Sequence, residues 1–440
     1  MKHIKTAILT LLVMSVSWTK AQSVATDSLT LTGIITQVIN NYPALKRANQ
    51  DLISADAKIG LTKTAYLPDV VFSSSYSRIG PTTSISMPIN GTTRTFSLFP
   101  ENVYSASFSV NENIYDFGKT AKNIALDQKN KELIQITVEQ AKQRISTAVM
   151  GNYYAISFLQ EAVRIKDEQL KTLDEHLEFV QKKAASGSAT QYDIMTTKVR
   201  ISVIENQKTD IQTSLQIQTG QLNSLLGQPV ESHLTLKSIN IDQEIIPSVD
   251  SLCNIAFSNR NEIKLSLQKE EITKSRLSVV KAQNNPSFNF FASGGFKNGY
   301  LNEYLQDVGK LNFAVGVGLK VPIFDANRSK FIKMQVNSDL EANQQETELT
   351  RRSINNEVLE NRVNAMAALK KVKQSELQLK QALQAYNLAE ISYQAGAITN
   401  LDLLDSYTAV SESKLMLFKT NIDYAVNLQK LKITLGQKLY

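Results

Sequence analysis

The chain has 440 residues and a formal net charge of +7 at pH 7, with 48 basic and 41 acidic residues. Three of the lysines lie in the first 20 residues, and without them the charge falls to 45 − 41 = +4, which does not indicate nucleic-acid binding. Cys253 is the single cysteine, so an intramolecular disulfide is excluded.

Residues 1–21 have the composition of a secretory signal peptide. Lys2 and Lys5 precede an apolar run over residues 7–16, and Thr19-Lys20-Ala21 provides a cleavage site. The run is too short to span a membrane, and no later stretch of about 18 apolar residues follows it. We therefore expect an exported protein without an α-helical membrane span.

The remainder of the chain resembles two copies of one unit, which we place at residues 22–230 and 231–440. Gly187 and Gly396 are 396 − 187 = 209 residues apart. The same offset relates Asp116 to Asp325 and Leu226-Gly227 to Leu435-Gly436. A fixed offset between several matching positions is typical of an internal repeat.

Each repeat begins with two predicted helices, at residues 29–41 and 43–66 and again at 249–258 and 261–283. Pro68 and Pro286 follow these helices at an offset of 286 − 68 = 218, so repeat 1 holds nine additional residues before Asp116. The stretch with Pro81, Pro88, Gly91 and Pro100 accounts for them, and its composition predicts a loop.

Between the helices the apolar period changes to two, which predicts four strands at about 69–79, 103–114, 287–297 and 311–323. In the fourth strand we expect Phe313, Val315, Val317 and Leu319 on one face, opposite Asn312, Ala314, Gly316 and Gly318. An apolar face opposite a small, polar face over about 10 residues is typical of an outer-membrane β-barrel.

Four strands cannot close a barrel, because the smallest membrane barrels need about eight strands and an open edge in lipid leaves backbone groups unpaired. Three chains that share one barrel would supply twelve strands. The sequence thus predicts an α+β membrane protein, a homotrimer with a 12-stranded barrel in outer-membrane lipid. A half-exposed four-stranded sheet on a soluble protein is the alternative.

After the second strand of each repeat, a helical pattern continues without a break over residues 116–185 and 325–395. Such a length of roughly 70 residues corresponds to about 105 Å. Apolar residues at spacings of three and four predict a coiled-coil seam, and returning helices at 190–226 and 399–435 complete two long hairpins. At each hairpin tip a Gly precedes a Thr-x-x-Asp capping box, with Thr190 and Asp193 or Thr399 and Asp402.

These features together resemble the TolC family of outer-membrane channels. The resemblance includes Tyr66-Leu67-Pro68 before the first strand, residues 114–118 (Ile-Tyr-Asp-Phe-Gly) after the second strand, and the paired Leu-Gly helix ends. It implies a trimeric barrel continued by an α-helical coiled-coil barrel, a tunnel in the periplasm, with a periplasmic adaptor and an inner-membrane transporter as partners. The function it implies is efflux of small toxic molecules, and one-step (type I) protein secretion and a soluble periplasmic adaptor remain as alternatives.

The resemblance also assigns roles to individual residues. Asp402, Asp405 and Tyr393 match the residues that close the periplasmic mouth, although Asp402 is also explained by helix capping. Ile398 stands where the family has an arginine. The residues that match the adaptor-docking tips are Gly187, Ser188, Ala189, Gly396, Ala397 and Ile398.

An enzyme is not expected. His176 and His233 show no metal-ligand spacing, and no nucleophile motif is present, so we expect neither a metal site nor a cofactor.

Overall fold

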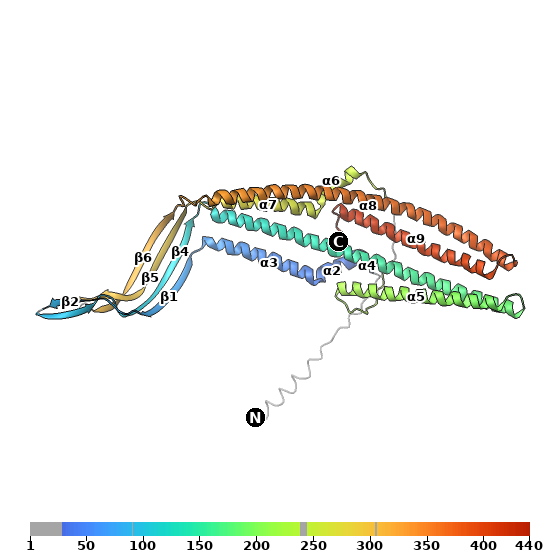
Figure 1. Ribbon diagram of the computed structural model, residues 1–440, viewed down its shortest axis with the longest axis horizontal. Coiled ribbons are helices and arrows are strands. Elements are labelled where there is room, and N and C mark those ends of the chain that lie inside the picture. The colour runs from blue at the N-terminus through green and yellow to red at the C-terminus, as the bar shows by residue number, and fades with distance from the viewer. Residues whose placement is uncertain (1–28, 90, 238–243, 304–305) are drawn as a thin grey trace, which may run out of the picture.

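The computed structural model describes residues 29–89, 91–237, 244–303 and 306–440, so the predicted signal peptide at residues 1–21 lies outside the described residues. The molecule is long and narrow, with a sheet at one end and the tips of two helical hairpins at the other (Figure 1). Shorter helices lie beside the long ones between these two ends.

Two helices of 67 residues run along the molecule, α4 (Lys119–Ala185) and α8 (Arg328–Gln394). After a short turn each is followed by a return helix, α5 (Gln191–Leu226) or α9 (Asn400–Thr434). The bounds of α4 and α8 differ by the offset seen in the sequence, since 328 − 119 = 209 and 394 − 185 = 209. The two long helices are therefore equal in length and begin and end 209 residues apart.

The helices before the strands form one layer with the long helices. They are α2 (Leu31–Asn41), α3 (Pro43–Lys63) with the 3-10 turn η1 (Thr64–Tyr66), α6 (Val249–Asn259) and α7 (Asn261–Ala282). Contacts run from α3 to α4, from α4 to α7 and from α7 to α8. The order of the layer is therefore α3-α4-α7-α8, and α3 and α8 are its edges.

The main sheet has four antiparallel strands in the order β1-β4-β5-β6. They are β1 (Asp69–Arg78), β4 (Asn102–Tyr115), β5 (Ser287–Leu301) and β6 (Asp307–Lys320). β6 starts and ends earlier than expected, so Val321 and Ile323 lie outside it. β5 continues beyond the expected end at residue 297.

The register gives this sheet two continuous faces, because directly opposite residues share a face. Phe72 is opposite Phe108, Phe108 is opposite Gly294, and Gly294 is opposite Phe313. On the other face Ser73, Ser107, Gly295 and Asn312 follow one another across the four strands in the same way. One face is thus apolar and the other small and polar, in agreement with the alternation in the sequence.

The stretch predicted as a loop between β1 and β4 instead contains a β-hairpin. β2 (Ser84–Ile89) and β3 (Thr92–Ser97) pair antiparallel from Ser84 opposite Ser97 to Ile89 opposite Thr92, and they extend beyond the main sheet (Figure 1). Pro88 lies within β2, which a two-stranded hairpin tolerates because each strand has a free edge. Because prolines are typical of loops, the composition predicted a loop where the structure has a short pair of strands.

A matching turn leads from the sheet into each long helix. The Asp116 carboxylate accepts hydrogen bonds from the backbone N–H of Gly118 at 3.0 Å and of Thr120 at 2.6 Å. Asp325 accepts one from the Ser329 N–H at 3.0 Å. These carboxylates satisfy N–H groups that have no partner within the first helical turn, which explains the Asp at both positions.

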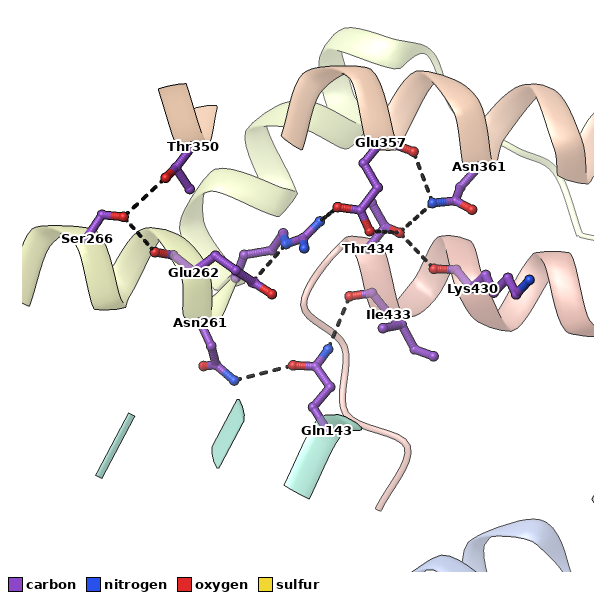
Figure 2. Close-up of polar contacts among 11 residues, drawn as sticks. Gln143, Asn261, Glu262, Ser266, Thr350, Glu357, Asn361, Lys430, Ile433 and Thr434 are labelled. Atoms are coloured by element: carbon purple, nitrogen blue, oxygen red, sulfur yellow. Dashed lines mark hydrogen bonds and ion pairs between the residues drawn. The ribbon is translucent and has the colours of Figure 1, made fainter. Parts of the chain in front are cut away.

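Polar contacts join four helices at mid-length of the molecule, next to an apolar cluster that includes Ile263, Ile354 and Leu431. The Arg260 side chain, 11% exposed, pairs with Glu262 at 3.0 Å and with Glu357 on α8. Figure 2 shows Glu357 next to Asn361 and Thr434, whose side chains are 2.9 Å apart, with Gln143 of α4 reaching the Ile433 carbonyl. Because both carboxylates pair with the guanidinium, this buried charge fixes α7 to α8. The Thr434 hydroxyl, 3.4 Å from the Glu357 carboxylate, joins α9 to them.

Candidate functional site

The two hairpin tips are built alike. Gly187 and Gly396 have φ of 77° and 73°, in the left-handed region where a glycine is favoured. Thr190 and Thr399 then cap α5 and α9, and both predicted capping boxes are present. The residues matched to adaptor docking lie on these turns and are exposed or half-exposed.

Asp402 and Asp405 have different partners. The Asp402 carboxylate accepts hydrogen bonds from the Thr399 hydroxyl at 2.6 Å and N–H at 2.9 Å, and these bonds lower its pKa. The Asp405 side chain is 61% exposed and forms an ion pair with Arg200 of α5. Asp402 therefore holds the tip of its own helix, whereas Asp405 connects the second hairpin to the first.

Tyr393 of α8 is buried, with 7% of its surface exposed, in a cluster of rings from α4. Its ring centroid lies 5.7 Å from that of His176 and 6.4 Å from that of Phe179. The Lys183 ammonium lies 4.6 Å from the Tyr393 centroid, a cation–π contact. Burial raises the pKa of the Tyr393 hydroxyl, and the negative charge of Asp193 adds to this effect.

Asn400 is a tip residue that the sequence analysis did not single out. It is 3% exposed, and its side-chain amide donates to the Asp193 carbonyl and to the Thr197 hydroxyl, both at 3.2 Å. Its Oδ1 lies 2.7 Å from Nε2 of His176. Since that oxygen can only accept, the Nε2 of His176 carries the proton and donates it.

The tips are therefore joined within one chain by contacts of α4 and α5 with α8 and α9. Ile398 on the turn of the second hairpin carries no charge. Lys183 and Arg200, both on the first hairpin, supply cations to the second hairpin.

At the other end of the molecule, the four residues predicted to face lipid lie exposed on the apolar face of β6. Phe313 is 85% exposed, Val317 60%, and Val315 and Leu319 66% each. Phe290 and Phe288 of β5 lie opposite Val317 and Leu319 and continue this face. Large apolar side chains in a contiguous exposed patch indicate contact with lipid or with another protein.

Within the described part of the chain, no helix combines the length and apolar character that crossing a membrane requires. The same residues contain no group of three or more His, Cys, Asp or Glu side chains placed to hold a metal ion.

Comparison with known proteins gives matches over most of the chain. The sequence model of the family described as "Outer membrane efflux protein" matches residues 34–228 and 252–437. The chain is 21% identical to the alkaline protease secretion protein AprF of Pseudomonas aeruginosa over 414 residues, which is 90% of this chain and 82% of AprF. It is 23% identical to the pyoverdine export outer membrane protein OpmQ of Pseudomonas putida, over 85% of this chain and 79% of OpmQ.

Outer membrane protein TolC of Escherichia coli is 17% identical over 90% of this chain and 79% of its own length. Among solved structures, the outer membrane protein VceC of Vibrio cholerae superposes with a TM-score of 0.72 at 19% identity and covers 93% of this chain and 97% of VceC. The resemblance to the TolC family is confirmed.

Proposed function

Because the chain belongs to the outer membrane efflux protein family, a family of channel proteins in the outer membrane with a helical tunnel in the periplasm, we propose that three copies form one channel for efflux of small molecules. The periplasmic adaptor and the inner-membrane transporter of a tripartite system are its proposed partners. Localisation in the outer membrane does not fit the alternative of a soluble adaptor.

The observation that carries the proposal is that the sheet and the helical layer are open at corresponding edges. β1 and β6 are the edges of the sheet, and α3 and α8, which lie next to them in the chain, are the edges of the layer. Both edge helices expose apolar side chains, with Leu61 71% exposed on α3 and Met334 67% exposed on α8. A neighbouring copy would cover the strand edge and the helix edge at the same time.

Three copies would close a barrel of twelve strands, and β6 of one chain would pair with β1 of the next. The apolar face, with Phe313, Val315, Val317 and Leu319, would then contact lipid, and the serine-rich face would line the lumen. A helix of 67 residues extends about 100 Å, which would carry the tunnel far from the membrane.

The hairpin tips would form the periplasmic mouth. Three-fold symmetry would place Asp402 and Asp405 of each chain around one opening, where clustered carboxylates attract cations. Tyr393 and the ion pair of Asp405 with Arg200 would hold the two hairpins of each chain together in the closed state. The exposed turns that include Gly187, Ser188 and Ala189, and Gly396, Ala397 and Ile398, would receive the adaptor.

Protein secretion is the second candidate, because the relative AprF is named for secretion of an alkaline protease whereas OpmQ is named for pyoverdine export. Deletion of the gene in its host distinguishes the two functions. For efflux we expect higher accumulation of a toxic dye such as ethidium and an unchanged set of secreted proteins. Loss of a secreted protein with unchanged dye accumulation would contradict efflux and favour secretion.

A further inference from the structure

The polar face of the sheet carries two lysines directly opposite each other near its outer end, the end away from the helices. Lys297 of β5 is opposite Lys310 of β6, and Lys297 is also opposite Ser105 on the polar face of β4. Both ammonium groups lie over the ring of Tyr300, at 5.6 and 5.8 Å from its centroid. Like charges directly opposite each other destabilise a strand pair unless an anion compensates them.

No carboxylate of the described residues forms an ion pair with Lys297 or Lys310. Two acidic side chains at this end of the sheet, Asp307 and Glu101, have other partners. Asp307 accepts hydrogen bonds from the Asn298 amide and the Gly299 N–H, both at 2.7 Å. Glu101 pairs with Arg78 at 3.3 Å. The two positive charges therefore remain uncompensated within the described chain.

A bulge in β5 gives this place a fixed shape. The register of β5 and β6 shifts between Lys297 and Tyr300. The two residues between them, Asn298 and Gly299, are held in place by hydrogen bonds. Asn298, 5% exposed, accepts from the Tyr104 N–H at 2.9 Å and donates to the Asn102 carbonyl at 2.6 Å. Bulges commonly redirect a side chain, and here the bulge leaves the Tyr300 ring beneath both ammonium groups.

Next to Lys297 and Tyr300 lies a pocket that is also lined by apolar side chains. Lys297 and Tyr300 line this pocket of about 450 Å³ together with Ile79, Phe99, Val103 and the Pro81–Thr83 segment. Apart from Val103 of β4, the apolar wall of the pocket comes from both ends of the stretch that contains the β2–β3 hairpin. Most of the wall is therefore built by the stretch in which repeat 1 differs from repeat 2. The pocket thus combines positive charge, an aromatic ring and apolar surface, as ligand sites for amphipathic molecules do.

We propose that this pocket binds an organic anion, whose carboxylate or sulfonate contacts Lys297 and whose apolar body lies against Phe99, Ile79 and Val103. Lys310 does not line the pocket, but its ammonium group lies over the same Tyr300 ring and adds a second positive charge beside the bound anion. The inference rests on the proposed channel, in which the polar face lines the lumen and the pocket opens at the outer mouth. Three such pockets would give that mouth a preference for anions, opposite to the acidic tips at the periplasmic end.

Side-specific block of single channels in a planar lipid bilayer tests this site. The probe is naphthalene-2-sulfonate, which joins a sulfonate to an apolar body; 2-naphthol lacks the charge and inorganic sulfate lacks the apolar body. We expect naphthalene-2-sulfonate to block each channel from one side only, and both reference compounds to block at least about tenfold more weakly because each loses one set of contacts.

Variants assign the block to the pocket. The double variant Lys297→Gln, Lys310→Gln should raise the half-blocking concentration at least about tenfold, since contacts to charged groups are lost. Lys320→Gln is the matched control, because Lys320 lies on the same face of β6 at its opposite end. Phe99→Ser, at an exposed position, should weaken the block by naphthalene-2-sulfonate. The block by inorganic sulfate should stay unchanged, because sulfate has no apolar body to contact Phe99.

Conducting channels that are blocked equally from both sides, or a double variant that is blocked like the wild type, would overturn the inference and leave the proposed function intact. A chain that forms no conducting channel would contradict the proposed function itself, and the inference with it.

Discussion

Arg200 of α5 and Asp405 of α9 form an ion pair that joins the two helical hairpins at their tips. The residues are 205 positions apart in the chain, and the pair brings a cation next to a carboxylate that we place in the periplasmic mouth. The charge of the mouth therefore depends on whether this pair is closed.

Arg200→Gln is expected to increase cation selectivity, because it leaves Asp405 unneutralised, and Asp405→Asn is expected to decrease it. The Asp405 side chain is 61% exposed, so the pair contributes less than about 1 kcal/mol to stability and both variants should fold normally. Reversal potentials of single channels in a KCl gradient measure the selectivity.

Arg276→Gln is the control for this pair, since Arg276 pairs with Asp339 at 3.6 Å between α7 and α8, away from the tips. If Arg200→Gln and Asp405→Asn shifted the reversal potential in the same direction, the proposed place of Asp405 in the mouth would be wrong.

Asn400→Ala is expected to loosen both tips. The change removes the hydrogen bonds to His176, Asp193 and Thr197 and leaves Nε2 of His176 without this partner, at a cost of about 1 to 3 kcal/mol. Hydrogen exchange of the first turns of α5 and α9 should become faster. Asn427→Ala, which removes only a bond to the Asp423 carbonyl, serves as the control, and equal exchange in the two variants would contradict a special role of Asn400.

Much of this arrangement could be predicted from the sequence, because it depends on local patterns. Alternation placed Phe313 and Leu319 on the exposed apolar face, and the Thr-x-x-Asp spacing located both tips. The hairpin of β2 and β3 was missed, because Pro88 and Gly91 are typical of loops and a strand pair outside the main sheet has no buried face to mark it.

The contacts between the hairpins could not be predicted from the sequence. His176 and Asn400 lie 224 positions apart, and no periodicity relates them. Asn400 directly follows Thr399, the N-cap residue of α9. An Asn is common at the start of an exposed helix, so its presence there does not indicate a buried contact. Arg200 similarly resembles a solvated charge until the fold brings α9 beside it.

Val317→Arg should impair assembly in the outer membrane. An arginine at the middle of the lipid-facing surface of a barrel costs about 2 to 4 kcal/mol, and every chain of the assembly would incur that cost. Gly318→Ser, on the polar face of the same strand, should be tolerated, since a Cβ at Gly318 would meet no atom within 4 Å. The amount of protein in the outer-membrane fraction is the measurement, and equal amounts of both variants would show that the faces are assigned wrongly.

The C-terminal segment should detach from α4 in acid. Burial alone would raise the pKa of Glu139, but hydrogen bonds from Lys142, Lys438 and Tyr440 lower it to about 2. A carboxylate with a lowered pKa contributes stability above its ordinary value of 4.5, and this contribution is lost as the pH falls from there toward about 2. Hydrogen exchange of residues 436–440, corrected for its intrinsic pH dependence, should therefore increase in that range.

Glu139→Gln removes the titrating group and should give fast exchange of residues 436–440 already at neutral pH. A wild-type segment whose corrected exchange stayed the same down to pH about 2 would contradict the role of Glu139 as the residue that holds this end of the chain.

The mass of the protein extracted in detergent, determined by light scattering with the detergent contribution subtracted, tests the shared barrel most directly. We predict three chains per particle, because the open edges of β1 and β6 and of α3 and α8 need a neighbour on both sides. A well-folded particle of one chain would contradict the shared barrel and the proposed channel with it.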